Sequence, residues 1–241
     1  MRDTAPRVWL VAHYDTKGQR LSMAGRLVAV GLVLAGAAGV IKLGIAAAVG
    51  IRVGPAAWWI AAALAAAGGL ALALLGLRND SPGALDNGTG VRAVLTAAEA
   101  LRKDAGVGVI LPDAEELGLV GARALARERP ELFHDAAVIN LDGLDDQGPV
   151  FALVHRPGPV TDAACAALGA RRWRWLPVLV DGIPLGRVAR EAVTILRGNL
   201  ATMRIVHTPR DTAERLTYAG ADGIAASMVH TLKRVLGAAP R

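Results

Sequence analysis

Histidine and carboxylate side chains follow short apolar runs at four places in the sequence. His13 and Asp15 follow residues 8–12, Glu115 and Glu116 follow residues 107–111, Asp142 follows residues 136–140, and His207 follows residues 201–206. These residue types can bind a metal ion or transfer a proton. If each run is a strand of one parallel sheet, the side chains at the strand ends meet in one cleft, where open α/β sheets bind their ligands.

The rest of the sequence predicts the elements that would position these residues. Short β-rich apolar runs alternate with amphipathic helical stretches, among them residues 91–102 and the alanine-rich residues 161–170. This alternation predicts an α/β fold with a mostly parallel central sheet flanked by helices. Asp86 is a further candidate, because SPGALDNGTG leads into the first of these helices, where backbone N–H groups favour a carboxylate.

The charges of these residues indicate a metal centre. Asp86, Glu115, Glu116 and Asp142 would repel one another in one cleft, and their pKa values would rise unless cations neutralised them. Two divalent ions solve this problem, since three acidic ligands and a bridging hydroxide balance the charge of two Zn²⁺. Nitrogen and oxygen ligands without a thiolate suit zinc, with Co²⁺ or Mn²⁺ as alternatives.

The adjacent glutamates predict a division of roles. Successive side chains point in different directions, so one of Glu115 and Glu116 can bind a metal while the other faces water as a general base. Asp15 lies two residues after His13 and on the same side of an extended segment, so we expect it to orient the imidazole.

Five segments, taken in order, resemble the aminopeptidase Y family of di-zinc exopeptidases, which includes bacterial leucyl aminopeptidases and the glutamate carboxypeptidase type. They are AHYDT (12–16), SPGALDNGTG (81–90), DAEELGLVGARAL (113–125), VINLDG (138–143) and HTPRDT (207–212). The resemblance implies a peptidase that hydrolyses peptide bonds with two bound Zn²⁺ ions.

The resemblance also implies a role for each site residue. The implied metal ligands are His13 and Asp142 for one zinc, Glu116 and His207 for the other, and Asp86 as the bridge. Glu115 would be the base that deprotonates the bridging water. A cis peptide bond between Asp86 and Asn87 and an outer position for Asp211 are further implications.

Two other functions stay open from the sequence. One is a one-zinc acyltransferase of the glutaminyl cyclase type, and the other is a non-catalytic membrane scaffold with a vestigial peptidase domain. In addition, only residues 1–12 precede the first motif, whereas the family fold has a further strand and helix there. We therefore expect a sheet trimmed at its amino-terminal edge, or an amino-terminal part outside this sequence.

An apolar hairpin interrupts the predicted peptidase domain. Residues 55–77 contain no charge and are long enough to cross a bilayer, and residues 27–51 are similar except for Lys42. The short connection at 52–54 makes the two helices antiparallel, and small residues at Gly31, Ala35 and Gly39 predict their contact. The expected parts are residues 1–20 and 80–241 for the peptidase domain and residues 21–79 for the transmembrane insert.

The basic residues near the hairpin predict its orientation. Lys17, Arg20, Arg26 and Arg78 flank it, whereas only Arg52 lies in its loop, so the positive-inside rule places the catalytic part in the cytoplasm. The formal net charge of +6 is mostly scattered arginine without interleaved aromatic residues, which does not indicate nucleic-acid binding. RRWRW at 171–175 fits either a substrate cleft or the bilayer surface.

Overall fold

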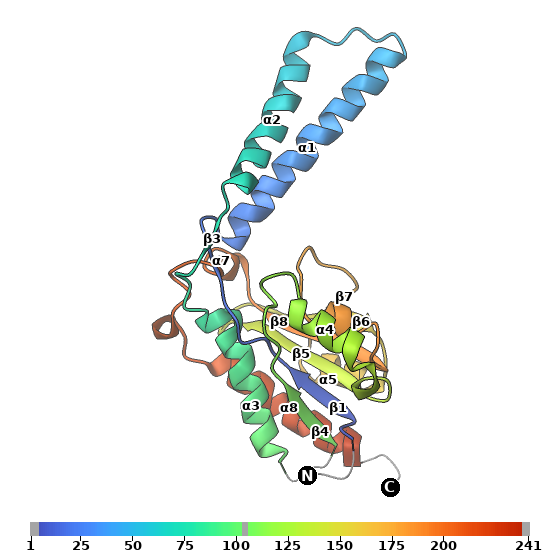
Figure 1. The fold of residues 1–241 in the computed structure, drawn as a ribbon, viewed down its shortest axis with the longest axis vertical. Coiled ribbons are helices and arrows are strands. Elements are labelled where there is room, and N and C mark those ends of the chain that lie inside the picture. The colour runs from blue at the N-terminus through green and yellow to red at the C-terminus, as the bar shows by residue number, and fades with distance from the viewer. Residues whose placement is uncertain (1–4, 103–105, 238–241) are drawn as a thin grey trace.

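A six-stranded sheet forms the centre of the protein (Figure 1). The computed structural model describes residues 5–102 and 106–237. The strand order is β4 (Val107–Ile110), β1 (Val8–Val11), β5 (Ala137–Leu144), β8 (Glu191–Arg197), β6 (Val150–Arg156) and β7 (Arg171–Trp173). The first four are parallel, whereas β6 is antiparallel to β8 and β7 is parallel to β6. The prediction of a mostly parallel sheet is confirmed.

Helices cover both faces of this sheet. The helices α3 (Thr89–Ala100), α5 (Pro159–Ala167) and α8 (Ala219–Gly237) pack on one face, and α4 (Val120–Glu128) and α6 (Gly182–Leu185) on the other. Alternate residues of β1 divide between the two layers, with Leu10 in the core beside α3 and α8 and Val11 in the core beside α4. Single helical turns lie at Pro130–Leu132 and Ala213–Arg215, and Ala84–Gly88 forms a turn whose backbone is not helical at Asp86 and Asn87. The predicted helices over 91–102 and 161–170 correspond to α3 and α5.

The predicted strand over residues 201–206 is wrong. This segment forms the short helix α7 (Leu200–Met203) followed by turns. The side chain of Asn199 accepts hydrogen bonds from the backbone N–H groups of Ala201, at 2.7 Å, and Thr202, at 3.3 Å. Such capping favours a helical turn over an extended chain, whatever the apolar pattern that follows it. The strand that precedes His207 is instead β8.

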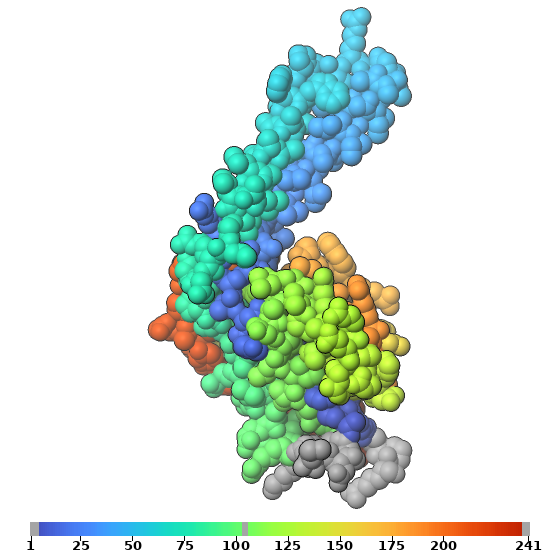
Figure 2. All heavy atoms as spheres, viewed as in Figure 1, coloured from blue at the N-terminus to red at the C-terminus, as the bar shows by residue number. Residues whose placement is uncertain are grey.

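Two long apolar helices project from the α/β body (Figures 1 and 2). They are α1 (Met23–Ala48) and α2 (Pro55–Ala73), and both are long and apolar enough to cross a membrane. An antiparallel ribbon of β2 (Gly18–Gln19) and β3 (Leu77–Arg78) joins the two ends of this hairpin. The two predicted helices are confirmed, whereas the division of the chain at residues 20 and 79 stays a prediction.

Glycines allow the two helices to approach closely. A Cβ atom at Gly36 would lie 2.5 Å from the backbone nitrogen of Ala65, and one at Gly68 would lie 2.5 Å from the carbonyl oxygen of Ala29. A Cβ atom at Gly31 would have no neighbour within 4 Å. The predicted contact at Gly31 is therefore wrong, and Ala35 is likewise exposed; the interface runs through Gly36 and Gly39.

We expect Gly36→Leu to separate the helices in detergent micelles. The free energy of unfolding of the hairpin should fall by about 1–3 kcal/mol, as overpacking typically causes, and its melting temperature should fall accordingly. Gly31→Leu is the matched control, because the same side chain has open space there. The loss of helical circular dichroism on heating measures both variants. Equal melting curves for the two variants would contradict the interface described above.

Candidate metal centre

Six side chains meet at one edge of the sheet. The ligand atoms of His13, Glu115 and Asp142 form one group, and those of Asp86, Glu116 and His207 form another. Within each group these atoms all lie within 4.8 Å of one another. Thus the structure brings together every residue that the sequence suggested as a metal ligand, and also the suggested base.

The carboxylate of Asp86 lies between the two histidines. Its Oδ1 atom is 3.3 Å from Nε2 of His13, and its Oδ2 atom is 3.1 Å from Nε2 of His207. His13 Nε2 is also 3.8 Å from Asp142 Oδ1, and His207 Nε2 is 2.9 Å from Glu116 Oε1. Each histidine therefore shares Asp86 with the other and has one carboxylate of its own, which is the arrangement that a bridging ligand requires.

The backbone around Asp86 is fixed by two buried side chains. Asp211 accepts hydrogen bonds from the N–H groups of Leu85, at 2.7 Å, and Asp86, at 3.1 Å. Asn87 donates to the carbonyl oxygen of Leu141 at 3.0 Å and accepts from the N–H of Gly143 at 3.1 Å. These bonds join the Asp86 turn to β5, next to Asp142. The bond between Asp86 and Asn87 is cis, as the resemblance implies.

Asp15 fixes the loop that carries the two glutamates. Its carboxylate accepts hydrogen bonds from the N–H groups of Glu115, at 3.0 Å, and Glu116, at 3.1 Å. The Nδ1 atom of His13 lies 3.1 Å from the backbone oxygen of Asp15 and 3.5 Å from its Oδ1 atom. Asp15 therefore contacts the imidazole as expected, but its carboxylate bonds mainly to the glutamate loop. This contact makes it a positioning residue.

Two basic residues at the cleft were not suggested as site residues by the sequence. Lys17 Nζ lies 2.7 Å from Glu116 Oε2 and donates to the backbone oxygen of Glu116 at 2.8 Å. Arg26 of α1 donates to Gln19 Oε1 at 3.0 Å and lies 3.4 Å from His207 Nδ1. In the sequence both were interpreted only as charges that orient the hairpin, because nothing in their spacing places them beside the site.

Asp181 is a further buried carboxylate that sequence analysis missed. It is fully buried, and neither of its oxygens has a hydrogen-bond partner in residues 5–102 and 106–237. Burial raises its pKa to about 7, with opposing effects from His13 and Asp142. It precedes α6 and follows none of the predicted strands, so the sequence pattern gave no signal for it.

Burial and mutual repulsion shift the pKa values of the acidic residues. Burial, together with the charges of Asp142 and Asp86, raises the pKa of Glu115 to about 10. Burial likewise raises the pKa of Asp142, whose attraction to His13 opposes the effect. For Asp86, burial is outweighed by hydrogen bonds to His13 and His207, which hold its pKa well below its usual range. The carboxylates thus depend on nearby positive charge to be ionised together in one cleft.

The histidines carry that positive charge when they are protonated. Burial lowers the pKa of His207, but its contacts with Asp86 and Glu116 prevail and raise the pKa to about 9. The pKa of His13 is also well above its usual value, because Asp142, Asp15 and Asp86 outweigh the effect of burial. Dications held by the same residues would supply this charge in place of the protons.

Zinc loading should release protons at pH 7. Because its pKa is about 9, His207 is protonated there, and zinc binds only the neutral imidazole. Zinc affinity should therefore rise with pH until His207 is deprotonated. Calorimetric titration in two buffers of different ionisation enthalpy measures the release. We expect at least one proton per chain, and buffer-independent heats would contradict this. His207→Gln should reduce the release, and the exposed His230→Gln should not.

Asp211→Ala should weaken zinc binding by about 10- to 100-fold, as the loss of outer partners of metal ligands typically does. The reason is that Asp211 holds the backbone of Asp86 in place. Asp222→Ala is the control, since Asp222 is paired with Arg92 away from the cleft. Competition with a chelator of known affinity measures both. Unchanged affinity in Asp211→Ala would show that Asp86 is positioned without this brace.

A cleft of about 210 Å³ lies beside the six residues. Its walls include Met23 and Arg26 of α1, Pro177 and Val180 from the segment before α6, and Met203 of α7. A second pocket of about 330 Å³ shares Pro177 and Met203 with it and extends to Leu27 of α1. The root of the hairpin is thus part of the cleft wall.

Solved structures with similar folds are bacterial peptidases. The zinc aminopeptidase BSAP of Bacillus subtilis matches with a TM-score of 0.57 and 16% identity, over 96% of this chain and 46% of that one. Legionella pneumophila LapA matches with a TM-score of 0.57 and 14% identity, over 96% and 53%. The peptidase M28 precursor of Shewanella amazonensis matches with a TM-score of 0.51 and 23% identity, over 65% and 38%. At these identities the likeness shows the fold.

The chain spans about half the length of the first two of these structures. A comparison with curated proteins finds no match. The family model described as peptidase family M28 matches residues 2–172, which is more than half of the chain and includes five of the six clustered residues. The expected kinship with the zinc exopeptidases is confirmed, and the chain belongs to peptidase family M28.

Proposed function

We propose that this protein is a membrane-anchored di-zinc exopeptidase, of the aminopeptidase type, that hydrolyses short peptides. The observation that carries the proposal is the pair of three-residue groups, which Asp86 links through its contacts with both histidines. Family membership and the fold of the zinc aminopeptidases support it. Each group supplies one imidazole nitrogen and carboxylate oxygens, as hydrolytic zinc sites do.

The donor set fits zinc. It contains two imidazoles and four carboxylates without a thiolate, and Oε1 of the buried Glu116 lies 2.9 Å from Nε2 of His207. In this proposal His13 and Asp142 would hold one ion, Glu116 and His207 would hold the other, and Asp86 would serve both. When bound, the ions polarise the substrate carbonyl and acidify the attacking water. Lys17 pairs with Oε2 of Glu116, and Oε1 of that carboxylate is the atom nearer to His207.

Glu115 is the general base in this proposal. It lines the cleft together with Asp142, its carboxylate lies near His13, and its loop is fixed by the carboxylate of Asp15. A carboxylate in that place takes a proton from the attacking water and passes it to the leaving amine. Neutralisation of the neighbouring carboxylates by cations would lower the pKa of Glu115 towards the range in which it can act as a base.

The two alternatives are less well supported. A one-zinc acyltransferase needs only one group, whereas two groups of ligand atoms lie together here, with Asp86 in contact with both histidines. A non-catalytic scaffold does not require six ionisable side chains to be buried together, nor Asp211 and Asp15 to fix the backbone around them. The converging geometry therefore favours a two-metal hydrolase.

The hairpin is the membrane anchor in this proposal. Only 11% of the most apolar 18-residue stretch of either helix is buried, so their apolar side chains do not form a protein core. Trp58 and Trp59 lie near one end of α2, where indoles favour the interface of a bilayer. With Lys17, Arg20, Arg26 and Arg78 flanking the hairpin, the positive-inside rule places the cleft in the cytoplasm. The partners are then a peptide and a bilayer, and no nucleic acid.

Glu115→Gln should retain zinc and lose about 10²–10⁴ of the turnover, the usual contribution of a general base. Asp86→Ala should lose both zinc and turnover, because both groups share that carboxylate. Hydrolysis of aminoacyl-p-nitroanilides by the zinc-loaded protein in vesicles, together with the zinc content, measures these effects. The exposed Glu99→Gln is the matched control.

Full turnover in Glu115→Gln would refute the role of Glu115 as base. One zinc per active chain, with cyclisation of amino-terminal glutamine, would favour the acyltransferase. A zinc-loaded protein without turnover of any peptide would favour the scaffold.

A further inference from the structure

The segment 171–179 exposes large apolar side chains. It comprises β7 and the loop that leads to α6, with the sequence RRWRWLPVL. Trp175 is 74% exposed, Leu179 63% and Trp173 50%. Side chains of this size are normally buried, so three of them in nine residues indicate a surface that meets another apolar phase.

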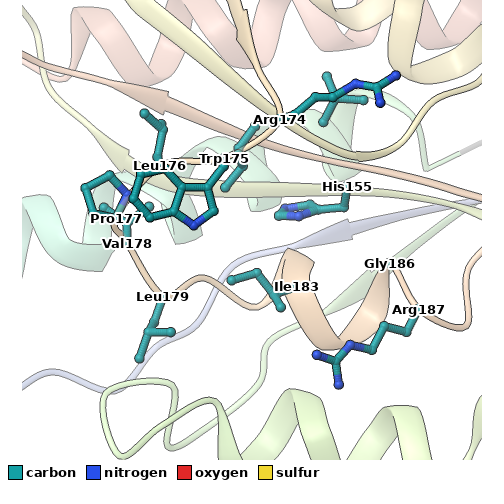
Figure 3. A pocket seen from close by; sticks show the side chains of 12 residues that line it. His155, Arg174, Trp175, Leu176, Pro177, Val178, Leu179, Ile183, Gly186 and Arg187 are labelled. Carbon is teal, nitrogen blue, oxygen red and sulfur yellow. The ribbon is translucent and has the colours of Figure 1, made fainter.

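The part of this segment after β7, residues 174–179, is also separated from the body of the domain, whereas β7 itself pairs with β6 in the central sheet. A pocket of about 640 Å³ lies between it and the residues of β6 and α6, with Trp175 and Leu179 on one side and His155 and Ile183 on the other (Figure 3). The segment therefore contributes its apolar side chains to the rim of a pocket and not to the core of the domain.

The segment faces the root of the hairpin across the metal cleft. Met23 and Arg26 of α1 line that cleft together with Pro177 and Val180, and the adjoining apolar pocket joins Leu27 to Leu176 and Pro177. In Figure 1 the loop after β7 extends from the body on the side from which α1 and α2 project. The hairpin root and the segment thus lie on opposite sides of the same opening.

Arginines surround the exposed tryptophans. Arg171 and Arg174 are exposed and have no carboxylate partner within 4.0 Å among the described residues, whereas Arg172 pairs with Asp162. Arg204, at the end of α7 beside the hairpin root, is exposed as well. Tryptophan with free arginine is typical of protein surfaces in the headgroup region of anionic bilayers.

We propose that residues 171–179 rest in the headgroup region of the bilayer that holds α1 and α2, so that the metal cleft opens at the membrane surface and takes peptides lying there. This inference rests on the proposed function, since it needs both the anchor and the peptidase. A hairpin root and a tryptophan-bearing loop on either side of one opening give the cleft two contacts with the same surface. Peptide substrates with an apolar or acylated end would then reach the metals by diffusion along the bilayer.

Spin labels at three exposed apolar positions test the placement. Cysteines replace Leu34 in the hairpin, Trp175 in the segment and Leu95 on α3, in a Cys165→Ser background, in vesicles with one quarter phosphatidylglycerol. Collisions with oxygen and with a water-soluble nickel chelate measure the depth of each label. We expect the Leu34 label in the hydrocarbon, the Trp175 label at the interface and the Leu95 label in water.

The outcomes separate the inference from the proposed function. If the Trp175 label is as accessible to the nickel chelate as the Leu95 label, the inference is overturned. If the Leu34 label is embedded in the same sample, the membrane anchor still holds. A Leu34 label in water refutes the anchor and the inference together. A Trp175 label that is aqueous in vesicles but shielded when peptide is added shows that the segment binds substrate and not lipid, which also overturns the inference.

A pair of substrates tests the consequence for the cleft. A leucyl peptide with a carboxy-terminal acyl chain binds vesicles, and the same peptide without the chain does not. The wild-type protein should have a higher kcat/KM for the acylated form, and Trp175→Ser with Arg174→Gln should reduce that preference while leaving hydrolysis of the soluble peptide unchanged. Arg127→Gln, at an exposed position on α4, is the control. Equal preference in all three proteins would overturn the inference, even if both peptides are hydrolysed.

Discussion

The sharing of one carboxylate by two histidines is the interaction on which the cleft depends. Asp86 is within 3.3 Å of His13 Nε2 and 3.1 Å of His207 Nε2, although these residues come from opposite ends of the chain. The hydrogen bonds of the neighbouring residues hold Asp86 and the two histidines in position. Asp211 holds the backbone of Asp86, Asn87 ties it to β5, and Asp15 holds the glutamate loop against His13. Without positive charge at this point, the four buried carboxylates could not all stay ionised.

Much of this arrangement could be predicted because a parallel sheet turns sequence pattern into spatial position. Strands β1, β4 and β5 are short apolar runs, and a polar residue just after such a run must lie at the same edge of the sheet. His13 and Glu115 follow this rule, whereas Asp142 lies within β5, near its carboxyl end, where the pairing with β8 is irregular. The positions of these side chains agree with the sequence, whereas their roles as ligands and base stay predictions.

Other features of the site and the hairpin could not be predicted from the sequence. They depend on local hydrogen bonds, or on which side of a helix faces its partner. Asn199 caps a helical turn where an apolar pattern indicated a strand, so His207 reaches the cleft from a turn. Asp181 and Lys17 become neighbours of the site only through tertiary packing. In the hairpin, a repeat of small residues indicates that helices can approach, but Gly31 and Gly36 look alike in sequence and only Gly36 faces the partner helix.

The ribbon of β2 and β3 explains how a long insertion is compatible with a finely positioned site. The chain leaves at Gln19 and returns at Leu77, and these two residues pair directly. An unstructured excursion of that length would impose an entropic penalty on bringing its ends together, which grows with the logarithm of its length. Here the antiparallel helices hold the two ends of the insertion side by side. For the α/β body the insertion therefore has the same effect as a short turn between adjacent residues. A domain split in sequence can thereby fold as one continuous unit.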